Sequence, residues 1–434
     1  MNTPEPKETR QVSQVVEHLF RHESGKMIAT LTRIFGLEHL TLAEDVVQEA
    51  LIRALQTWPF YGLPENPSAW IMRASRNLAL DAVRRQKVFR QKEAEIVHLI
   101  ERDQPEPNAA ALNENEISDD RLRMMFVCCH PLVPEDAQAA LALKTLCGFS
   151  ITEISRAFLT SDAAIAKRLT RAKQKIRDAR IPFEIPAAIE LAARLDGVLQ
   201  TLYLLFNEGY KASSGNKLVR QELCHEAIRL GSLLAKHSAG NRPKTHALLA
   251  LMHFSAARLP ARADDAGNLL LLKEQDRSRW DQNLIARGMF HFAQSAAGDE
   301  MSVYHLQSAI AACHCAAPNY DATDWPRILE LYDQLVGFDE NPVIALNRAV
   351  AVANVNGPKA GLQSLAAIPS RNKLEEYYLY YAVMGEFEAQ LNNPEAAAAH
   401  FRKAIELSEL ESERAFLRKK LNASEEQIAS QTAH

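Results

Sequence analysis

Apolar residues along most of this chain recur every three or four positions, which is the spacing of amphipathic α-helices. The segment 42–56 is a clear case, and its apolar face consists of Val47, Ala50, Leu51, Ala54 and Leu55. Thr41 and Glu44 have the spacing of a capping box at the start of this helix, and Trp58-Pro59 predicts its end. Segments in which apolar and polar residues alternate one by one, the pattern of β-strands, are nearly absent. We therefore predict an all-α protein.

A second predicted helix, over residues 70–92, carries apolar and cationic residues on different faces. Its apolar positions are Ile71, Ala74, Leu78 and Ala82, spaced three or four residues apart. Its cations include Arg73, Arg76, Arg84, Arg85 and Lys87, and the segment holds seven Lys or Arg against the single acid Asp81. A charge concentration of this kind suggests an anionic partner.

A helix-turn-helix is predicted between residues 150 and 177. Ser150 and Glu153 form a capping box for the first helix, Leu159-Thr160 make the turn, and Ser161 caps the second helix. The apolar positions of the second helix are Ile165, Leu169, Ala172 and Ile176, so Lys167, Arg168, Arg171 and Lys175 should face outward together. Such a helix fits the major groove of DNA.

Composition strengthens the interpretation of these basic helices. The 434 residues are 47% hydrophobic and 24% charged, with a formal net charge of -4, so the cations stand out against an acidic remainder. One basic stripe is usually a solvated face, but two such helices joined by a connector favour nucleic-acid binding. No apolar run is long enough for a membrane span, and six cysteines without a regular framework fit a reducing cytoplasm, where we expect the protein.

Changes in composition and periodicity along the chain predict the domain organisation. Residues 11–92 and 119–183 form two compact helical segments, and the acidic, proline-containing residues 93–118 read as a flexible linker. Residues 184–422 are helical and weakly repetitive. The turns Asn356-Gly357-Pro358 and Asn392-Asn393-Pro394 lie close to one tetratricopeptide period of ~34 residues apart. The aligned apolar positions are Ala360, Leu365 and Ile368 in one unit and Ala396, Phe401 and Ala404 in the next.

Several motifs resemble extracytoplasmic-function (group 4) sigma factors of bacterial RNA polymerase. Those similar to region 2 are Ala43-Glu44-Asp45-Val46-Val47-Gln48-Glu49-Ala50, Trp58-Pro59, Ala69-Trp70 and Arg76-Asn77-Leu78-Ala79-Leu80-Asp81 with Arg84-Arg85. Those similar to region 4 are Glu153-Ile154, Phe158-Leu159 and Arg168-Leu169-Thr170-Arg171-Ala172-Lys173.

Further motifs resemble the subgroup with a long C-terminal helical extension. They are Phe126-Val127-Cys128-Cys129-His130-Pro131, Leu202-Tyr203-Leu204-Leu205-Phe206-Asn207-Glu208-Gly209-Tyr210, Glu274-Gln275-Asp276-Arg277-Ser278-Arg279-Trp280-Asp281, Thr323-Asp324-Trp325 and Leu346-Asn347-Arg348-Ala349-Val350-Ala351. Together with the region 2 and region 4 motifs they span most of the chain.

The resemblance implies a factor that binds core RNA polymerase and selects promoter DNA. Its implied core-binding residues are Asp45, Gln48, Glu49 and Arg53. The residues implied at the minus-ten element are Trp70, Arg73, Arg76, Asn77, Arg84 and Arg85. For Trp70 the alternative, which we slightly favour, is a packing role in the hydrophobic core of the domain. Those implied at the minus-thirty-five element are Ser161, Lys167, Arg168, Arg171, Lys173 and Lys175. Ala163, Ala164 and Ala166 occupy early recognition positions, so few direct base contacts are expected there.

No catalytic, cofactor or metal site is predicted. The chain has no glycine-rich phosphate loop, nucleophile elbow or His-Glu-x-x-His helix. Cys128-Cys129-His130 and Cys313-His314-Cys315 lack common zinc spacing, so buried thiols are the favoured interpretation. The polar motifs 207–210 and 276–281 either line a ligand pocket or, as we favour, supply interhelical ion pairs and caps.

Two other functions stay open at this level. One is a helix-turn-helix regulator fused to a tetratricopeptide scaffold, and the other is a scaffold whose basic helices bind RNA. The acidic helix 42–56 favours the sigma factor, because a simple repressor has no need of it. For the C-terminal half we expect a regulatory role or a protein partner.

Overall fold

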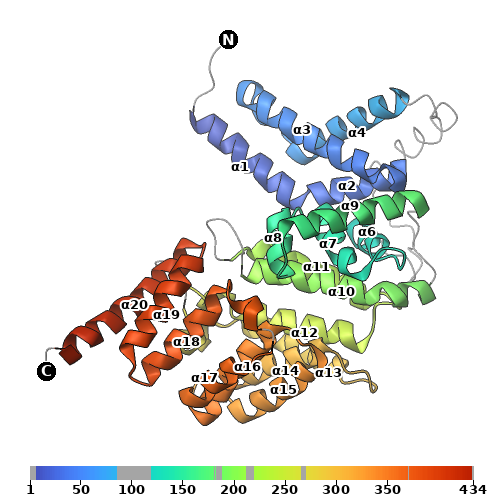
Figure 1. The fold of residues 1–434 in the computed structure, drawn as a ribbon. Helices are drawn as coiled ribbons and strands as arrows, with labels where there is room; N and C mark the ends of the chain where they lie inside the picture. Colours follow the sequence, from blue (N-terminus) through green and yellow to red (C-terminus); the bar gives the residue numbers. More distant parts are fainter. Residues whose placement is uncertain are drawn as a thin grey trace. The chain divides into compact units, whose positions relative to one another are not determined.

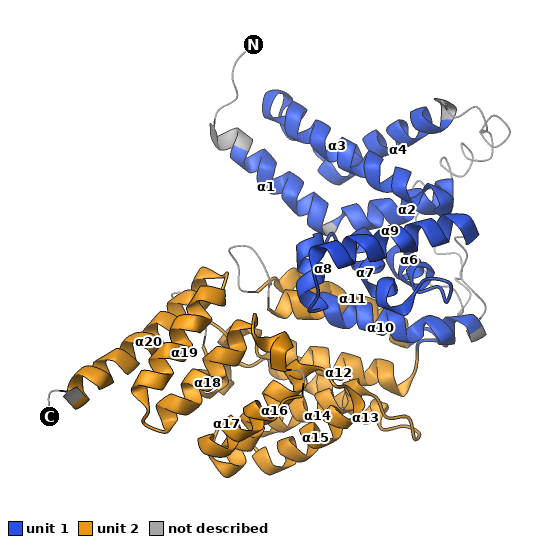
Figure 2. Ribbon diagram, in the orientation of Figure 1, with its two compact units in different colours: residues 1–205, 236–240 blue, residues 206–235, 241–434 orange. Residues whose placement is uncertain are grey.

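The computed structural model describes residues 6–85, 119–179, 181, 188–211, 219–264, 270–369 and 371–432. Every regular element in these ranges is a helix, which confirms the all-α prediction (Figure 1). The helices form two compact units (Figure 2): residues 1–205 with 236–240, and residues 206–235 with 241–434. The predicted linker 93–118 lies outside the described residues, and the predicted domain boundaries stay a prediction.

The first unit begins with four α-helices, here called the α1–α4 bundle. They are α1 (Pro6–His22), α2 (Ser24–Phe35), α3 (Leu40–Tyr61) and α4 (Pro67–Arg85), with the short 3₁₀ helix η1 (Leu37–His39) before α3. Apolar stripes at helical spacing face inward and leave Met27, Leu31, Val47 and Ile71 almost completely buried. The bundle therefore has a core of its own.

The bounds of α3 correct three details of the sequence interpretation. The capping box at Thr41 and Glu44 was wrong, because α3 starts at Leu40 directly after η1 without a side-chain cap. Pro59 lies inside the helix, which continues to Tyr61 and is followed by Gly62 as its C-cap. Leu55 was expected on the buried face but is 42% exposed.

The rest of the first unit contains the helix-turn-helix, and we call its four helices the α6–α9 bundle. They are α6 (Asp120–Cys128), α7 (Glu135–Leu146), α8 (Ile151–Ala157) and α9 (Asp162–Ala179). The capping box of Ser150 and Glu153 is present, and Leu159 adopts a φ of 49° in the turn. All four predicted apolar positions of α9 are buried. The first part of α10 (Ala188–Tyr210) completes this unit, where Gly197 lies against Cys129.

The second unit is a series of antiparallel helices. After α11 (Gln221–Lys236) the pairs are α12 (Pro243–Ala257) with α13 (Gln282–Ser295), α14 (Val303–Ala316) with α15 (Trp325–Phe338), α16 (Pro342–Asn356) with α17 (Pro358–Ala366), and α18 (Tyr378–Gln390) with α19 (Pro394–Leu407). The helix α20 (Glu411–Thr432) follows and packs on α19. Short 3₁₀ helices are η3 (Leu259–Ala261), η4 (Leu272–Glu274), η5 (Arg277–Arg279) and η6 (Arg371–Leu374).

The predicted repeat coincides with two of these pairs. Its two turns join α16 to α17 and α18 to α19. Leu365 and Phe401, which the alignment of the two units matched, are 1% and 2% exposed. Gly385 allows close packing, since a Cβ atom there would lie 2.8 Å from the Phe401 ring. Stacked helical hairpins therefore describe this part of the chain.

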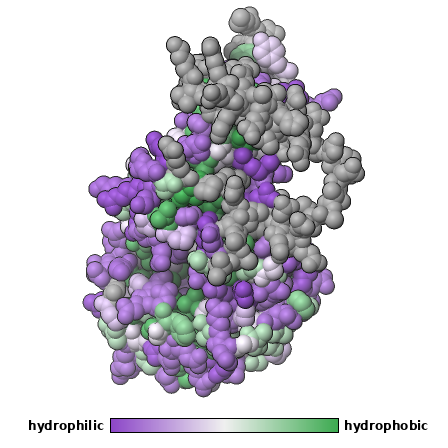
Figure 3. All heavy atoms as spheres, turned by 90° about the vertical axis from the view of Figure 1, so that its right-hand side faces the viewer, coloured by the Kyte–Doolittle hydropathy of each residue, from purple (hydrophilic) through white to green (hydrophobic). Residues whose placement is uncertain are grey.

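None of the described helices is long and apolar enough to cross a membrane. On the face turned toward the viewer in Figure 3, hydrophilic side chains predominate and hydrophobic ones form small patches. This surface is typical of helices that bury one apolar stripe and expose a polar face.

Candidate nucleic-acid interface

The exposed side of α3 gathers all four residues expected to bind core polymerase. Asp45, Gln48, Glu49 and Arg53 are exposed, because the opposite face of the helix fills the core of the α1–α4 bundle. Arg53 donates from Nε to Glu49 Oε1 at 2.9 Å. Ile52, which is 48% exposed, adds an apolar side chain to this charged face. A face of this mixed character suits a protein partner.

Glu44 lies on the same helix and behaves differently. It is 8% exposed, and its Oε1 accepts a hydrogen bond of 2.9 Å from Thr145 Oγ1 of α7. Its Oε2 forms an ion pair with Lys173 of α9. Sequence reasoning assigned Glu44 to a local cap because no local signal reveals partners so distant along the chain.

The residues expected at the minus-ten element lie on α4. Trp70 is half-buried and packs edge-on against Trp58, with ring centroids 5.4 Å apart. Arg73 and Asn77 are exposed, whereas Arg76 is half-buried. The side chains of Arg84 and Arg85 lie outside the described residues. Trp70 therefore contributes to packing, while the spacing of 70, 73 and 77 places these three residues on one face of α4.

An open hollow of about 470 Å³ lies between α1 and the start of α4. The lining includes Gln11, Gln14, Asn66 and Ser68, which offer amide and hydroxyl groups. Asn66 also orders the start of α4, since its Oδ1 accepts from Ala69 N at 3.0 Å. These groups can hydrogen-bond to the edge of a polar, planar ligand.

The residues expected at the minus-thirty-five element divide into two groups on α9. Lys167, Arg171 and Lys175 are exposed and lie on one side, four residues apart. Ser161 caps the helix by accepting from Ala164 N at 3.3 Å. This group remains available to a polyanion.

The other two cations are engaged within the protein. Arg168 pairs with Asp136 of α7 at 3.0 Å, and Lys173 pairs with Glu44. The expectation that Arg168 faces outward with its neighbours is corrected, because its side chain is 29% exposed and turns to α7. Lys173, expected at the DNA backbone, is likewise occupied in this conformation.

Asp162 was missed by sequence reasoning although it fixes the angle of the helix-turn-helix. Its carboxylate accepts from Thr152 Oγ1 at 2.7 Å and from Ser155 Oγ at 2.5 Å, so it ties α9 to α8. These two hydrogen bonds lower the pKa of Asp162. The sequence signal that could have revealed this contact is the spacing of Thr152 and Ser155, one helical turn apart on α8, followed by an acid, Asp162, at the start of α9.

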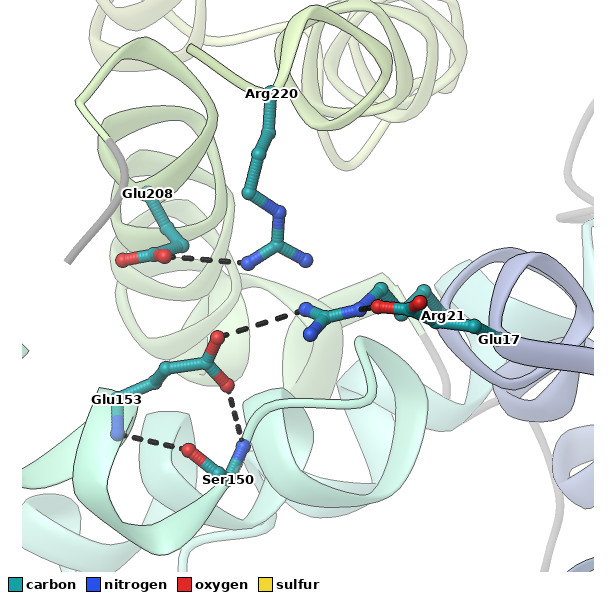
Figure 4. A network of polar contacts seen from close by, with 6 residues as sticks. All are labelled: Glu17, Arg21, Ser150, Glu153, Glu208 and Arg220. Carbon is teal, nitrogen blue, oxygen red and sulfur yellow. Dashed lines mark hydrogen bonds and ion pairs between the residues drawn. The ribbon is translucent and has the colours of Figure 1, made fainter. Parts of the chain in front are cut away.

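The polar motifs of the second unit are structural in the described residues. Glu208 and Arg220 form a buried ion pair of 3.2 Å (Figure 4). Arg277 donates to the carbonyl oxygens of His314 and Ala317 at 2.7 and 2.6 Å. Asp276, Asp281 and Asp324 accept from backbone amides at helix starts. Ion pairs and caps, the favoured interpretation, account for these motifs.

The cysteines are free thiols. Cys128, Cys129, Cys147 and Cys224 are buried, whereas Cys313 and Cys315 are half-buried. Burial raises the pKa of Cys129 to about 12, which keeps that thiol protonated and unreactive. Within the described ranges no three His, Cys, Asp or Glu side chains are arranged to hold a metal ion.

Comparison with known proteins identifies the family of the first unit. Residues 19–88 match Sigma-70 region 2, and residues 123–176 match Sigma-70, region 4. The ECF RNA polymerase sigma factor SigE of Mycolicibacterium smegmatis is 27% identical over 163 residues, which are 37% of this chain and 60% of SigE. The chain is an extracytoplasmic-function-type sigma factor. Its C-terminal extension includes residues 194–296, which match a family of unknown function, DUF6596.

Two further relatives show how far this similarity extends. An uncharacterized protein of Rhizobium meliloti (strain 1021) is 38% identical over 395 residues, covering 91% of this sigma factor and 92% of the relative. The probable RNA polymerase sigma factor RfaY of Xanthomonas campestris pv. campestris is 28% identical over 139 residues, which are 31% of this chain and 33% of RfaY. No solved structure matches the chain. The full-length relative therefore shares the extension, whereas the two named sigma factors align over shorter segments.

Proposed function

We propose that this sigma factor docks on core RNA polymerase through the exposed face of α3 and selects promoters with α4 and α9. The supporting observation is that three sets of residues are exposed on the helices that match regions 2 and 4. They are the mixed face of α3, Arg73 with Asn77 on α4, and the cationic row of α9. We place the region 2 domain at 11–92, the linker at 93–118, the region 4 domain at 119–183 and the C-terminal domain at 184–422.

At the minus-ten element, α4 offers one group for the DNA backbone and two groups for a base. Arg73 can hold a phosphate by charge, while the half-buried Trp70 offers one ring face and the exposed Asn77 an amide. The hollow beside Asn66 adds hydrogen-bonding groups close to the start of the same helix. An unstacked base is the partner that these groups fit best.

At the minus-thirty-five element, α9 acts mainly through phosphates. Lys167, Arg171 and Lys175 form a cationic row along the exposed side of the helix. Ala163 is exposed at the start of the helix and offers only a methyl group. Much of the discrimination at this element then comes from shape and backbone geometry.

The C-terminal hairpins serve regulation or bind a protein segment. Stacked helical pairs present extended surfaces suited to peptides. A truncation after residue 183 tests this role, and unchanged promoter activity and regulation in the truncated protein would remove the reason for it. Nucleotidyl transfer belongs to the polymerase, so we assign no catalysis to this chain.

Transcription with purified core polymerase tests the main proposal. Glu49→Lys reverses a charge on the α3 face and should weaken the complex with core by about tenfold or more, as expected for a charge in a protein interface. Glu65→Lys is the matched control, since Glu65 is exposed outside α3. A protein that binds specific DNA alone but forms no complex with core would instead be a helix-turn-helix regulator.

A further inference from the structure

Two arginines of the second unit lie against one indole ring. The guanidinium carbon of Arg277 in η5 is 4.9 Å from the centroid of the Trp280 ring, and that of Arg258, which follows α12, is 5.5 Å from it. A cation–π contact holds a guanidinium group in place without neutralising its charge. These two residues, here called the Arg258–Arg277 pair, therefore gather two positive charges at one aromatic side chain.

The described residues supply no carboxylate to balance this pair. Neither Arg258 nor Arg277 forms an ion pair with a described Asp or Glu. Burial and the nearby Arg258 lower the pKa of Arg277, and the groups that oppose this shift are the Cys315 thiol and the Tyr320 hydroxyl. Burial and both arginines lower the pKa of His314 to about 3, so its imidazole is neutral at pH 7. The pair therefore carries its charge without a counter-charge from the described part of the chain.

The acids that lie near η5 along the chain have other partners. Glu274 accepts from Leu271 N at 2.8 Å, and Asp276 accepts from Ser278 N at 2.9 Å. Asp281 caps the start of α13. Two partly buried charges of one sign are unfavourable when no opposite charge lies beside them, because burial removes water that would solvate them. An anion from outside the chain would remove this penalty.

Two hydrogen-bond donors of the cluster also lack acceptors among the described residues. They are Arg258 Nε and Trp280 Nε1, and both atoms are buried. Trp280 is 3% exposed, so bulk water does not satisfy its N–H group. The guanidinium of Arg258 has five N–H donors, and no hydrogen bond joins it to a described residue. Since buried donors normally have acceptors, these two point to a ligand that accepts hydrogen bonds.

Arg277 is held firmly in position within this cluster. Its Nη1 donates to the carbonyl oxygens of His314 and Ala317, and its Nη2 donates to Thr323 Oγ1 at 3.0 Å. These neutral acceptors orient the guanidinium and leave its charge in place. Both arginines are half-buried, so solvent reaches part of each side chain. A cation that is fixed before binding loses little conformational freedom when a ligand arrives.

We propose that the Arg258–Arg277 pair, together with Trp280 Nε1, binds the phosphate group of a small molecule. A phosphate monoester carries nearly two negative charges at pH 7, which match the two guanidinium charges, whereas a carboxylate offsets only one. Its oxygens can accept charge-assisted hydrogen bonds from Arg258. All three residues lie within residues 194–296, the part of the extension that matches a family of unknown function.

A bound phosphate would act on the packing of the first two helical pairs. Arg258 and Trp280 belong to the segment that runs from α12 to α13, whereas Arg277 also holds the end of α14 through His314 and Ala317. Neutralising the pair removes the repulsion between its members. The ligand should therefore stabilise the second unit, because it binds the folded protein and not the unfolded chain.

Titration calorimetry and thermal unfolding of the full-length protein test this site. The probes are inorganic phosphate and phenyl phosphate, with sodium acetate and sodium chloride at the same ionic strength as controls. We expect saturable binding of at least one phosphate compound and a Tm that rises with its concentration. Tighter binding of phenyl phosphate would indicate a phosphorylated metabolite, and tighter binding of inorganic phosphate would indicate the free ion. No saturable binding of either compound, or equal binding of acetate, would overturn the proposal.

Arg258→Met keeps much of the apolar stem and removes the charge and the donors. The affinity for phosphate should fall by at least about tenfold. The ligand-free variant should be at least as stable as the wild type, because no described acceptor loses its donor and the repulsion with Arg277 disappears. Arg279→Met is the matched control, since Arg279 is an exposed arginine of the same motif, and it should change neither property.

Trp280→Phe is a second variant, which removes the N–H group and keeps an aromatic ring beside the arginines. It should weaken phosphate binding by several-fold, and it decides the question if Arg258→Met does not fold. Wild-type phosphate affinity in the folded variants would overturn the site, and a less stable Arg258→Met with that affinity would mean that Arg258 only packs on Trp280. None of these measurements uses polymerase or promoter DNA, so their failure is distinct from a failure of the proposed function.

Discussion

Gly25→Ala tests the close packing of α2 on α7 without altering any charge. The new Cβ atom would lie 1.9 Å from the Leu146 oxygen and 2.5 Å from its carbonyl carbon, whereas real Cβ contacts essentially never fall below 3.0 Å. Both opposing atoms belong to the backbone of α7, so no side chain can rotate away. The clash between the new Cβ atom and Leu146 can be removed only if α2 and α7 move apart.

The size of the effect follows from two opposing tendencies. Overpacking of a tight contact costs about 1–3 kcal/mol, which shifts the balance between packed and separated helices by roughly 5- to 150-fold. Within α2 itself, alanine is favoured over glycine by about 1 kcal/mol. The α1–α4 bundle should therefore remain folded while its contact with α7 is weakened.

The assay is alkylation by iodoacetamide of Cys147, which follows Leu146 and is 4% exposed, and of Cys128, which is 0% exposed. It is combined with thermal unfolding followed by circular dichroism. Gly337→Ala is the matched control, because nothing lies within 4 Å of a Cβ atom at that position of α15. We expect faster alkylation only in Gly25→Ala. Equal rates in both variants and wild type, with folding intact, would refute the reasoning, since the α2–α7 contact would then not hold the bundles together.

Two further predictions concern DNA binding and acid stability. Arg171→Ala should weaken minus-thirty-five binding and reduce the slope of log affinity against log salt by roughly one, as one phosphate contact is lost; an unchanged slope would mean that Arg171 does not touch the backbone. Burial lowers the pKa of His253 from 6.5 to about 4, so its folded form resists protonation. His253 alone should then contribute up to about 3 kcal/mol to the stability of the second unit, a contribution that is complete above about pH 6.5 and is lost as the pH falls toward 4. Denaturant titrations at several pH values check this, and His253→Leu should make the profile less steep. His291, whose pKa falls to about 4, and His314, whose pKa falls to about 3, keep the rest of the slope.

Helical periodicity located the buried face of α9 because burial along a helix repeats locally. On α4 the predicted face was wrong, because Ser75, Ala79 and Val83 are buried with Ile71, whereas the predicted Ala74, Leu78 and Ala82 are half-buried. The four apolar positions of α9 are all buried, and both turns of the C-terminal repeat join helices as expected. The same logic placed Asp45, Gln48, Glu49 and Arg53 on the exposed side of α3. In each correctly predicted case one element packs against its immediate neighbours, so the local pattern carries enough information.

The wrong predictions concern features that depend on contacts between distant parts of the chain or on backbone hydrogen bonds. Pro59 was expected to end α3, yet the helix continues to Tyr61, and Gly62 N donates to Trp58 O at 2.9 Å. A proline removes one amide donor and need not end a helix this close to its terminus. Glu44 has the sequence spacing of a cap, but its charge finds Lys173 more than a hundred residues later. No periodic signal encodes such a pairing.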